Sequence, residues 1–180
     1  PVNLDIVREI TESVLIPCEL GGGIRDLDTI QRCLKAGAER VILGTAAIED
    51  RWLLTEACRR YGGAIVLGID ARNGCVATRG WKMQTEIKAV DLVREVTGCG
   101  LRRIIYTDID RDGTLTEPNF SAIFELMQNT RLKIIASGGV STLNHLKMLR
   151  QLEVEGAIVG KALYTGDLNL KQALDQVNQW

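Results

Sequence analysis

The sequence has no excess of charge of either sign. Its 180 residues include 22 Lys and Arg and 23 Asp and Glu, which gives a formal net charge of -1. A chain with this balance lacks the basic field that attracts nucleic acid or an anionic membrane surface. Its apolar runs are also short, and none approaches the ~20 residues that a helix needs to span a bilayer. We therefore expect neither a nucleic-acid partner nor a membrane partner.

Cysteine and histidine are too sparse and too scattered for a typical metal site. The five cysteines form no Cys-x-x-Cys pair, and His145 is the single histidine. These spacings argue against zinc and predict reduced, buried thiols. The amino end, PVNLDIVREI, is amphipathic and acidic and does not resemble a signal peptide. By default, these features predict a cytoplasmic protein.

What the sequence does contain is a regular alternation of strand and helix patterns. Hydrophobic residues make up 46% and charged residues 25%, which is typical of one soluble globular domain. The repeating order predicts an α/β fold with parallel strands and helices packed outside them. We expect strands at residues 14–20, 40–45, 64–70, 102–109, 133–139 and 156–162. Examples of the expected helices are residues 3–13, 26–37, 142–152 and 167–180.

The sequence also repeats itself at an offset of 116 residues. When residues 22–50 are placed over residues 138–166, seven positions are identical and the glycines at the strand ends coincide. A match of this kind without a gap favours duplication. The identical pairs are Gly22 and Gly138, Gly23 and Gly139, Leu27 and Leu143, Glu39 and Glu155, Ile42 and Ile158, Gly44 and Gly160, and Ala46 and Ala162.

The repeat predicts a particular domain organisation. Two halves of four strand–helix units each would close a (β/α)8 TIM barrel, and this chain supplies six such units. We expect residues 1–180 to form a single, incomplete TIM-barrel domain. Residues 1–62 would be the remainder of the first half-barrel, and residues 63–180 would be the second half-barrel. The six units would correspond to the third to the eighth of the complete barrel.

Asp70 stands out at the end of a buried strand. In the stretch AIVLGIDARNG an apolar run ends in this carboxylate, and a turn follows. Parallel α/β proteins place their active sites at the carboxyl ends of strands, so Asp70 is a candidate proton carrier. Its partner by the 116-residue repeat would lie about 46 positions before Pro1. We therefore expect the proton partner of Asp70 to be missing from this chain.

Glycine pairs end two of the strands at matching positions, in CELGGGIR and in IIASGGV. Backbone amides of glycine can approach a phosphate closely, and a helix N-terminus adds partial positive charge. Two copies in register predict two phosphate sites, although tight turns alone also require glycine. Arg25 and Lys161 either add charge to these sites or are only solvated. The candidate phosphate-binding residues are Gly22, Gly23, Arg25, Gly44, Thr45, Gly138, Gly139, Gly160 and Lys161.

Acidic residues alternate in the stretch YTDIDRDGTL. Asp108, Asp110 and Asp112 would share one face of an extended segment. The twelve-residue calcium pattern with its terminal Glu is not met, and a magnesium site is a lesser alternative. We expect one acid to orient substrate or a loop while the others cap turns and the next helix.

Trp81, in TRGWK, lies on the long loop that we expect after Asp70. An exposed aromatic ring on such a loop could stack over a planar base of a substrate. It could equally anchor the loop to the rim of the barrel. The sequence leaves both interpretations open.

Six segments together resemble one known family, the phosphoribosylformimino-aminoimidazole-carboxamide ribotide isomerases of histidine biosynthesis. The similarity extends over all 180 residues without an obvious gap. The segments are LGGGIRDLDTI, VILGTAAIED, GIDARNGCVATRGW, IIYTDIDRDGTLTEPN, IIASGGVSTL and EGAIVGKALY.

The resemblance implies a (β/α)8 barrel and a specific reaction. This reaction is the Amadori rearrangement of an aminoaldose to an aminoketose, without metal or organic cofactor. The family uses an aspartate base at the end of the first strand and an aspartate acid at the end of the fifth, which Asp70 matches. Thr107 and Asp112 match positions that assist the substrate, a bis-phosphorylated ribotide. The family's first two strands precede Pro1, so the resemblance also implies that the base is absent from this chain.

Several alternatives remain at this point. The chain could be an inactive two-phosphate-binding fragment, or the related cyclase subunit of imidazole glycerol phosphate synthase. An isomerase that also serves tryptophan synthesis is a further alternative, since that pathway uses the same type of rearrangement. We expect the full-length protein to be a monomer and the shorter chain to self-associate through its unpaired strand edges.

Overall fold

The computed structural model describes residues 3–177, and the chain divides into two compact units. Unit 1 comprises Pro1–Gly68 and Val96–Arg103, and unit 2 comprises Ile69–Glu95 and Ile104–Trp180. Both units contain strands with helices beside them, so the α/β class that the sequence predicts is confirmed. Within residues 3–177, no helix has the length and hydropathy that a membrane span requires.

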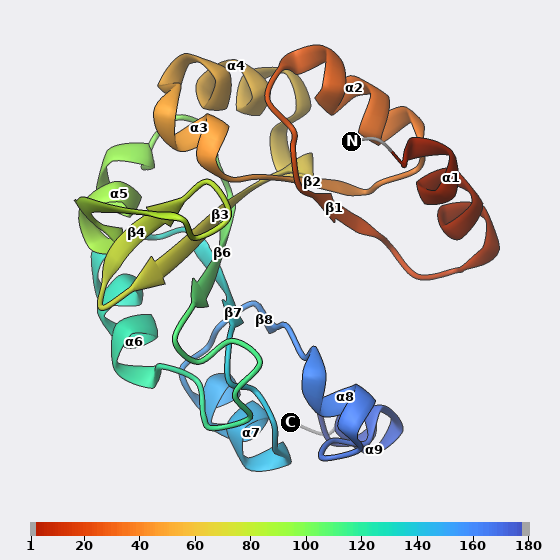
Figure 1. Ribbon diagram of the computed structural model, residues 1–180, viewed down its shortest axis with the longest axis vertical. Helices are drawn as coiled ribbons and strands as arrows, with labels where there is room; N and C mark the ends of the chain where they lie inside the picture. Colours follow the sequence, from red (N-terminus) through yellow and green to blue (C-terminus); the bar gives the residue numbers. More distant parts are fainter. Residues whose placement is uncertain (1–2, 178–180) are drawn as a thin grey trace. The chain divides into compact units, whose positions relative to one another are not determined.

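Unit 1 contains a parallel sheet (Figure 1). In this sheet β1 (Glu19–Gly21) pairs with β2 (Arg40–Leu43), and β2 pairs with the first residues of β3 (Ile65–Arg72). The fully buried side chains include Ile30, Leu43, Leu54, Ile65 and Leu67. The helices are α1 (Leu4–Ser13), α2 (Leu27–Lys35), α3 (Thr45–Glu49) and α4 (Arg51–Tyr61), followed by a 3-10 helix (Gly62–Ala64).

Unit 2 begins within β3. In sheet order β3 is followed by β6 (Arg103–Asp108), β7 (Lys133–Ser137) and β8 (Gly156–Ala157), and β7 and β8 are parallel. An antiparallel hairpin of β4 (Cys75–Thr78) and β5 (Met83–Lys88) extends from β3. The helices are α5 (Ala89–Val96), α6 (Phe120–Asn129), α7 (Leu143–Gln151), α8 (Lys161–Thr165) and α9 (Leu170–Val177).

Side-chain caps fix where several helices begin. The Asp26 carboxylate accepts a hydrogen bond from the Thr29 N–H at 2.7 Å and starts α2. The Thr142 hydroxyl accepts from the His145 N–H at 3.2 Å and starts α7. Each cap satisfies one of the N–H groups that lack a partner in the first turn of a helix. Asp26 and Thr142 are 116 residues apart, so the two helices begin at equivalent positions of the repeat.

Backbone hydrogen bonds recur at the same offset. In unit 1 the Glu39 N–H donates to the Cys18 carbonyl at 2.9 Å. In unit 2 the Glu155 N–H donates to the Ile134 carbonyl at 2.8 Å. The donor and the acceptor each lie 116 residues after their counterparts in unit 1. The strand registers match as well, with Glu19 beside Arg40 and Ile135 beside Gly156.

Two expected strands are much shorter than the sequence indicates. The strand expected at residues 14–20 forms only at Glu19–Gly21, and Pro17 has no N–H to donate to a sheet. The strand expected at residues 156–162 ends at Ala157, because Gly160 is the N-cap of α8. Apolar residues that look like strand in the sequence therefore belong in part to turns and to a short helix.

The expectation of a long loop after Asp70 is wrong, because a β-hairpin occupies this segment. Asn73 and Gly74 have positive φ values of 51° and 75° and connect β3 to β4 in a two-residue turn. Asn-Gly is the preferred pair for such turns because both residues tolerate this backbone conformation. The dipeptide was therefore a hairpin signal in the sequence.

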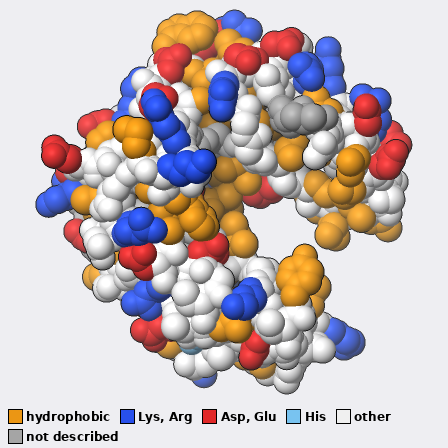
Figure 2. Space-filling view, viewed as in Figure 1, with side chains coloured by type: hydrophobic (Ala, Val, Ile, Leu, Met, Phe, Trp, Pro, Cys, Tyr) orange, Lys and Arg blue, Asp and Glu red, His pale blue; other side chains and the backbone are white. Residues whose placement is uncertain are grey.

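Large hydrophobic side chains are exposed near the strands at the ends of the sheet order. Among the described strands, β1 pairs only with β2, and β8 pairs only with β7. Leu15 and Ile16, just before β1, are 106% and 72% exposed, and Figure 2 shows hydrophobic side chains at the surface where α1 leads into β1. Tyr164, in α8 after β8, is 92% exposed. Self-association through such surfaces remains a prediction.

Candidate active site

Asp70 lies near the end of β3 and contacts Trp81 of the hairpin. The indole Nε1–H of Trp81 donates a hydrogen bond to Oδ2 of the half-buried Asp70 at 2.8 Å. Trp81 lies in the turn between β4 and β5, where its φ of 67° is positive. Its side chain remains 40% exposed. The hairpin thus brings the predicted acid and the predicted stacking residue into direct contact.

The carboxyl ends of β3 and β6 are neighbours. The Ile109 N–H, just past β6, donates to the carbonyl of Ala71 in β3 at 2.9 Å. Thr107 is the next-to-last residue of β6 and is buried, with 8% of its surface exposed. Asp70 and Thr107 therefore belong to adjacent strand ends, where an α/β sheet places its functional groups.

Residues 109–119 form a loop that we call the β6–α6 loop. At its start the buried Asp108 carboxylate accepts hydrogen bonds from the Asp110 N–H at 3.1 Å and from Nδ2 of Asn119 at 2.6 Å. Asn119 in turn accepts from the Ala122 N–H at 3.1 Å and caps α6. Asp108 therefore joins both ends of the loop, whereas the cap of α6 is Asn119 rather than one of the three acids.

The expectation that the three acids share one face of an extended segment is wrong. The chain turns after Asp108, and the Asp112 N–H donates back to the Asp108 carbonyl at 3.0 Å. Asp110 forms an ion pair with Arg72 at 2.9 Å. Residues 109–112 therefore form a turn, because a residue that follows a strand need not keep the strand's alternation.

The β6–α6 loop is also held by a contact between two of its own residues and by a contact from Ser141, which lies outside the loop. The Arg111 guanidinium donates to the Glu117 carbonyl at 2.9 Å, and the Ser141 hydroxyl donates to the Leu115 carbonyl at 3.1 Å. The Ser141 N–H donates to Nδ1 of His145 at 3.3 Å. Burial lowers the pKa of His145, which favours the neutral ring that can accept this bond.

A cavity of about 230 Å³ lies between this loop and the turn after β7. Lys161, at the start of α8, reaches across and donates from Nζ to the Gly113 carbonyl at 2.8 Å. The cavity therefore combines a predicted substrate-assisting residue with four predicted phosphate-binding residues of unit 2. Its lining includes Asp112, Gly113, Leu115, Gly138, Gly139, Gly160 and Lys161.

The phosphate-binding candidates of unit 1 form a second turn with the same backbone. Gly22 and Gly23 have φ values of 105° and 68°, against 95° and 79° for Gly138 and Gly139. Gly44 is the N-cap of α3 just as Gly160 is the N-cap of α8. The parallel pairing of β1 with β2 sets this turn beside Gly44 and Thr45. Gly22, Gly23 and Arg25 are exposed.

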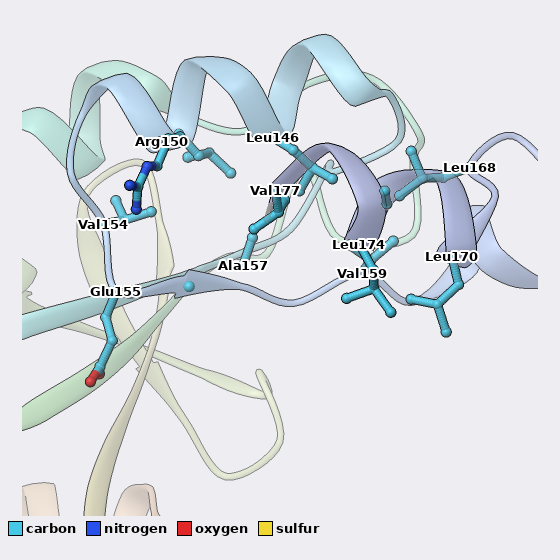
Figure 3. A pocket seen from close by; sticks show the side chains of 13 residues that line it. Leu146, Arg150, Val154, Glu155, Ala157, Val159, Leu168, Leu170, Leu174 and Val177 are labelled. Atoms are coloured by element: carbon cyan, nitrogen blue, oxygen red, sulfur yellow. The ribbon is translucent and has the colours of Figure 1, made fainter. Parts of the chain in front are cut away.

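A separate cavity lies between α7, β8 and α9 and has about 260 Å³ (Figure 3). Its lining is mainly apolar, with side chains such as Leu146, Val159 and Leu174, and it includes none of the predicted site residues. Within residues 3–177, no group of three or more His, Cys, Asp or Glu side chains is arranged to hold a metal ion.

Sequence reasoning missed the residues that hold the β6–α6 loop. Asn119 had a usable signal, because an Asn before a helical pattern predicts an N-cap. Ser141, His145 and Arg111 carry no such signal, because their contacts join segments that only the fold brings together. The remaining roles assigned to the site residues stay predictions.

The family model and the relatives found by comparison with known proteins point to the same family. A family model described as histidine biosynthesis protein matches residues 1–169. The chain is 55% identical over 177 residues to a protein of Dehalococcoides mccartyi (strain ATCC BAA-2266 / KCTC 15142 / 195), which covers 98% of this chain and 75% of that protein. That protein is named 1-(5-phosphoribosyl)-5-((5-phosphoribosylamino)methylideneamino)imidazole-4-carboxamide isomerase.

Two further relatives carry the same name. A Roseiflexus protein (strain RS-1) is 50% identical over 98% of this chain and 75% of its own length. A Heliobacterium modesticaldum protein is 50% identical over 97% of this chain and 72% of its own length. The matches run through both units.

Proposed function

Because the chain belongs to the histidine biosynthesis protein family, we propose that it is an aldose–ketose isomerase of that pathway. It converts the phosphoribosylformimino-aminoimidazole-carboxamide ribotide aminoaldose to the phosphoribulosyl aminoketose, in the cytoplasm and as a monomer when full-length. The observation that carries this proposal is the 55% identity, over 98% of the chain, to a protein named as this isomerase. The relatives that we compared are named isomerases, which does not favour the cyclase alternative.

Asp70 is the proposed general acid. Ring opening of the aminoaldose needs a proton at the ribose ring oxygen, and a protonated carboxyl group at a strand end can deliver it. The proposal is supported by the place of Asp70 at the end of β3 and by its contact with Trp81. In this proposal the indole exchanges its hydrogen bond with Asp70 for a stacking contact with the substrate. Thr107 and Asp112 assist from the end of β6 and from the β6–α6 loop.

The second proton carrier is proposed to lie outside the 180 residues. Formation of the enolamine needs a base that is ionised while the acid is protonated, which calls for two carboxyl groups in different environments. The family resemblance assigns this base to a strand that precedes residue 1. The matched segment covers 75% of the Dehalococcoides protein, which leaves room for such a strand in that relative. This chain would then supply six units of a (β/α)8 barrel built from two half-barrels.

The two glycine turns are proposed to bind the two phosphates of the substrate, one at each turn. Support comes from the similar positive φ values of Gly22–Gly23 and Gly138–Gly139, since glycine turns of this kind can present backbone N–H groups to an anion. Charge is added by Arg25 at one turn and by Lys161 at the other. Binding at both ends would hold the sugar in position for proton transfer.

Turnover of the aminoaldose, together with an equilibrium titration of its binding, tests the proposal. An isomerase that contains both carboxylates should lose about 10²–10⁴-fold in kcat on Asp70→Asn, because one proton transfer is removed. Asp110→Asn is the matched control, since Asp110 pairs with Arg72 and has no proposed role in the reaction. We expect this control to keep normal turnover.

Two forms of the protein separate the alternatives. We expect the 180-residue chain to bind without turnover, and a chain extended by the segment of the Dehalococcoides protein that the match does not cover to turn over. Binding that never becomes turnover would favour the two-phosphate-binding fragment. Turnover by the 180-residue chain would mean that the base lies within it. If the extended chain shows no binding and no turnover, the proposed function is overturned.

A further inference from the structure

The β6–α6 loop is held on both sides of Asp112. Before Asp112, the Arg111 guanidinium donates to the Glu117 carbonyl at 2.9 Å. After it, the Leu115 carbonyl accepts from Ser141, and the Leu115 side chain packs on a buried apolar cluster of α8 and α9. These contacts fix the two flanks of the loop and leave the Asp112–Gly113 peptide at its tip.

The Asp112 N–H donates to the Asp108 carbonyl at 3.0 Å, and Lys161 contacts the residue that follows Asp112. The Lys161 ammonium group donates to the carbonyl of this residue, Gly113, at 2.8 Å. Gly113 has a positive φ of 69°, so the backbone bends sharply at this point. An ammonium group carries three donors, and this bond uses one. Lys161 is exposed toward solvent and also lines the cavity beside Gly138 and Gly139.

We propose that Lys161 is a positioning residue that couples phosphate binding in this cavity to the position of Asp112. A phosphate beside the glycine turn meets the same ammonium group that holds Gly113. Charge-assisted hydrogen bonds from Lys to phosphate are strong, and one ammonium can serve the phosphate and the carbonyl together. Phosphate binding therefore strengthens the hold of Lys161 on the loop tip beside Asp112 when the substrate's end is in place. This inference rests on the proposed phosphate site.

Amide hydrogen exchange across residues 109–119 tests this coupling, with inorganic phosphate as the probe. In the unchanged protein, phosphate should slow exchange in this segment. Without phosphate, Lys161→Met should raise exchange at the loop tip about tenfold, the effect of one hydrogen bond from a charged donor. In this variant phosphate should no longer slow exchange. Lys161→Arg keeps a cationic donor and should retain part of both effects.

Lys147→Met is the matched control, because Lys147 is an exposed lysine of α7 that does not line the cavity. It should behave as the unchanged protein does. Exchange that is equal in the unchanged protein and in Lys161→Met would overturn the inference. So would a phosphate effect that survives Lys161→Met, or the absence of any phosphate effect in the unchanged protein.

The test of the Lys161 coupling can fail or succeed independently of the test of the isomerase activity. Phosphate-dependent exchange that needs Lys161, in an extended chain that does not turn over the aminoaldose, would support the coupling and overturn the isomerase. In an active extended chain, Lys161→Met should raise KM and also lower kcat, because it loosens both the phosphate and Asp112. A rise in KM alone would mean that Lys161 only binds phosphate.

Discussion

The turn after β1 and the turn after β7 have the same Gly-Gly sequence and nearly the same φ values, yet their surroundings differ. Gly22 and Gly23 are exposed, whereas Gly138 and Gly139 are buried. A Cβ atom on Gly139 would lie 2.2 Å from the Glu117 carbonyl oxygen, but one on Gly23 would meet nothing within 4 Å. The second turn is enclosed because the β6–α6 loop packs on it. A repeated sequence therefore specifies a repeated backbone, and a different segment decides whether the turn is covered.

The largest difference should appear when both turns receive a methyl group. Gly139→Ala combines a positive φ with an overlap against backbone and should cost about 3 kcal/mol or more of unfolding free energy. Gly23→Ala should cost only about 1–2 kcal/mol, because the positive φ is its sole penalty. Urea denaturation of both variants measures the difference. Equal losses would show that the loop yields readily and that the two turns are not distinguished by packing.

The helix caps that follow the two turns should differ in their pH dependence. Asp26→Ala and Thr142→Ala should each cost about 1 kcal/mol at pH 7, since each removes one cap. Hydrogen bonds from Thr29 lower the pKa of Asp26 below 3.8. Its stabilisation is therefore complete above pH 3.8 and is lost as the pH falls through the lower, folded-state value.

Unfolding measured at pH 7 and again near pH 3 distinguishes the two caps. The cost of Asp26→Ala should shrink toward pH 3, while the cost of Thr142→Ala stays constant. An Asp26→Ala penalty that is unchanged at low pH would contradict the assigned cause of the pKa shift.

The smallest expected effect concerns His145, whose counterpart in unit 1 is Thr29. Burial lowers the pKa of His145 from 6.5, so its neutral ring stabilises unit 2 above pH 6.5 and this stabilisation is lost as the pH falls through the lower folded value. The change should be small, because the ring is only partly buried and solvent screens its charged form. Unfolding followed from pH 8 to pH 5 should show this slope in the unchanged protein and lack it in His145→Thr. If the pH dependence of unfolding persists in the variant, a titratable group other than His145 causes it.

Much of the fold could be predicted from the sequence because its signals are local. Alternating apolar and helical patterns predict the α/β class, and Asp26 and Thr142 precede helices that begin close to where we expect them. The hairpin after β3 was missed although the Asn73–Gly74 pair signalled it. The strand expected at residues 156–162 was too long, because an apolar run does not reveal where a short helix takes over.

The candidate site was predictable only as a set of positions. Asp70 and the glycine pairs could be identified from their places at strand ends. The contact between Asp70 and Trp81, and that between Lys161 and Gly113, join residues 11 and 48 positions apart. No pattern in the sequence states such distances, because they depend on how turns and loops pack.

By itself, the sequence determined the alternation of the main parallel strands with helices, the repeat of 116 residues and the place of a glycine turn after two of the strands. These properties follow from local propensities and from the tolerance of glycine for positive φ. Only the tertiary structure decided that Asp108 joins the two ends of its loop, that this loop covers one glycine turn, and that Lys161 holds the loop beside Asp112. Those outcomes depend on contacts between distant segments, which form only when the chain packs.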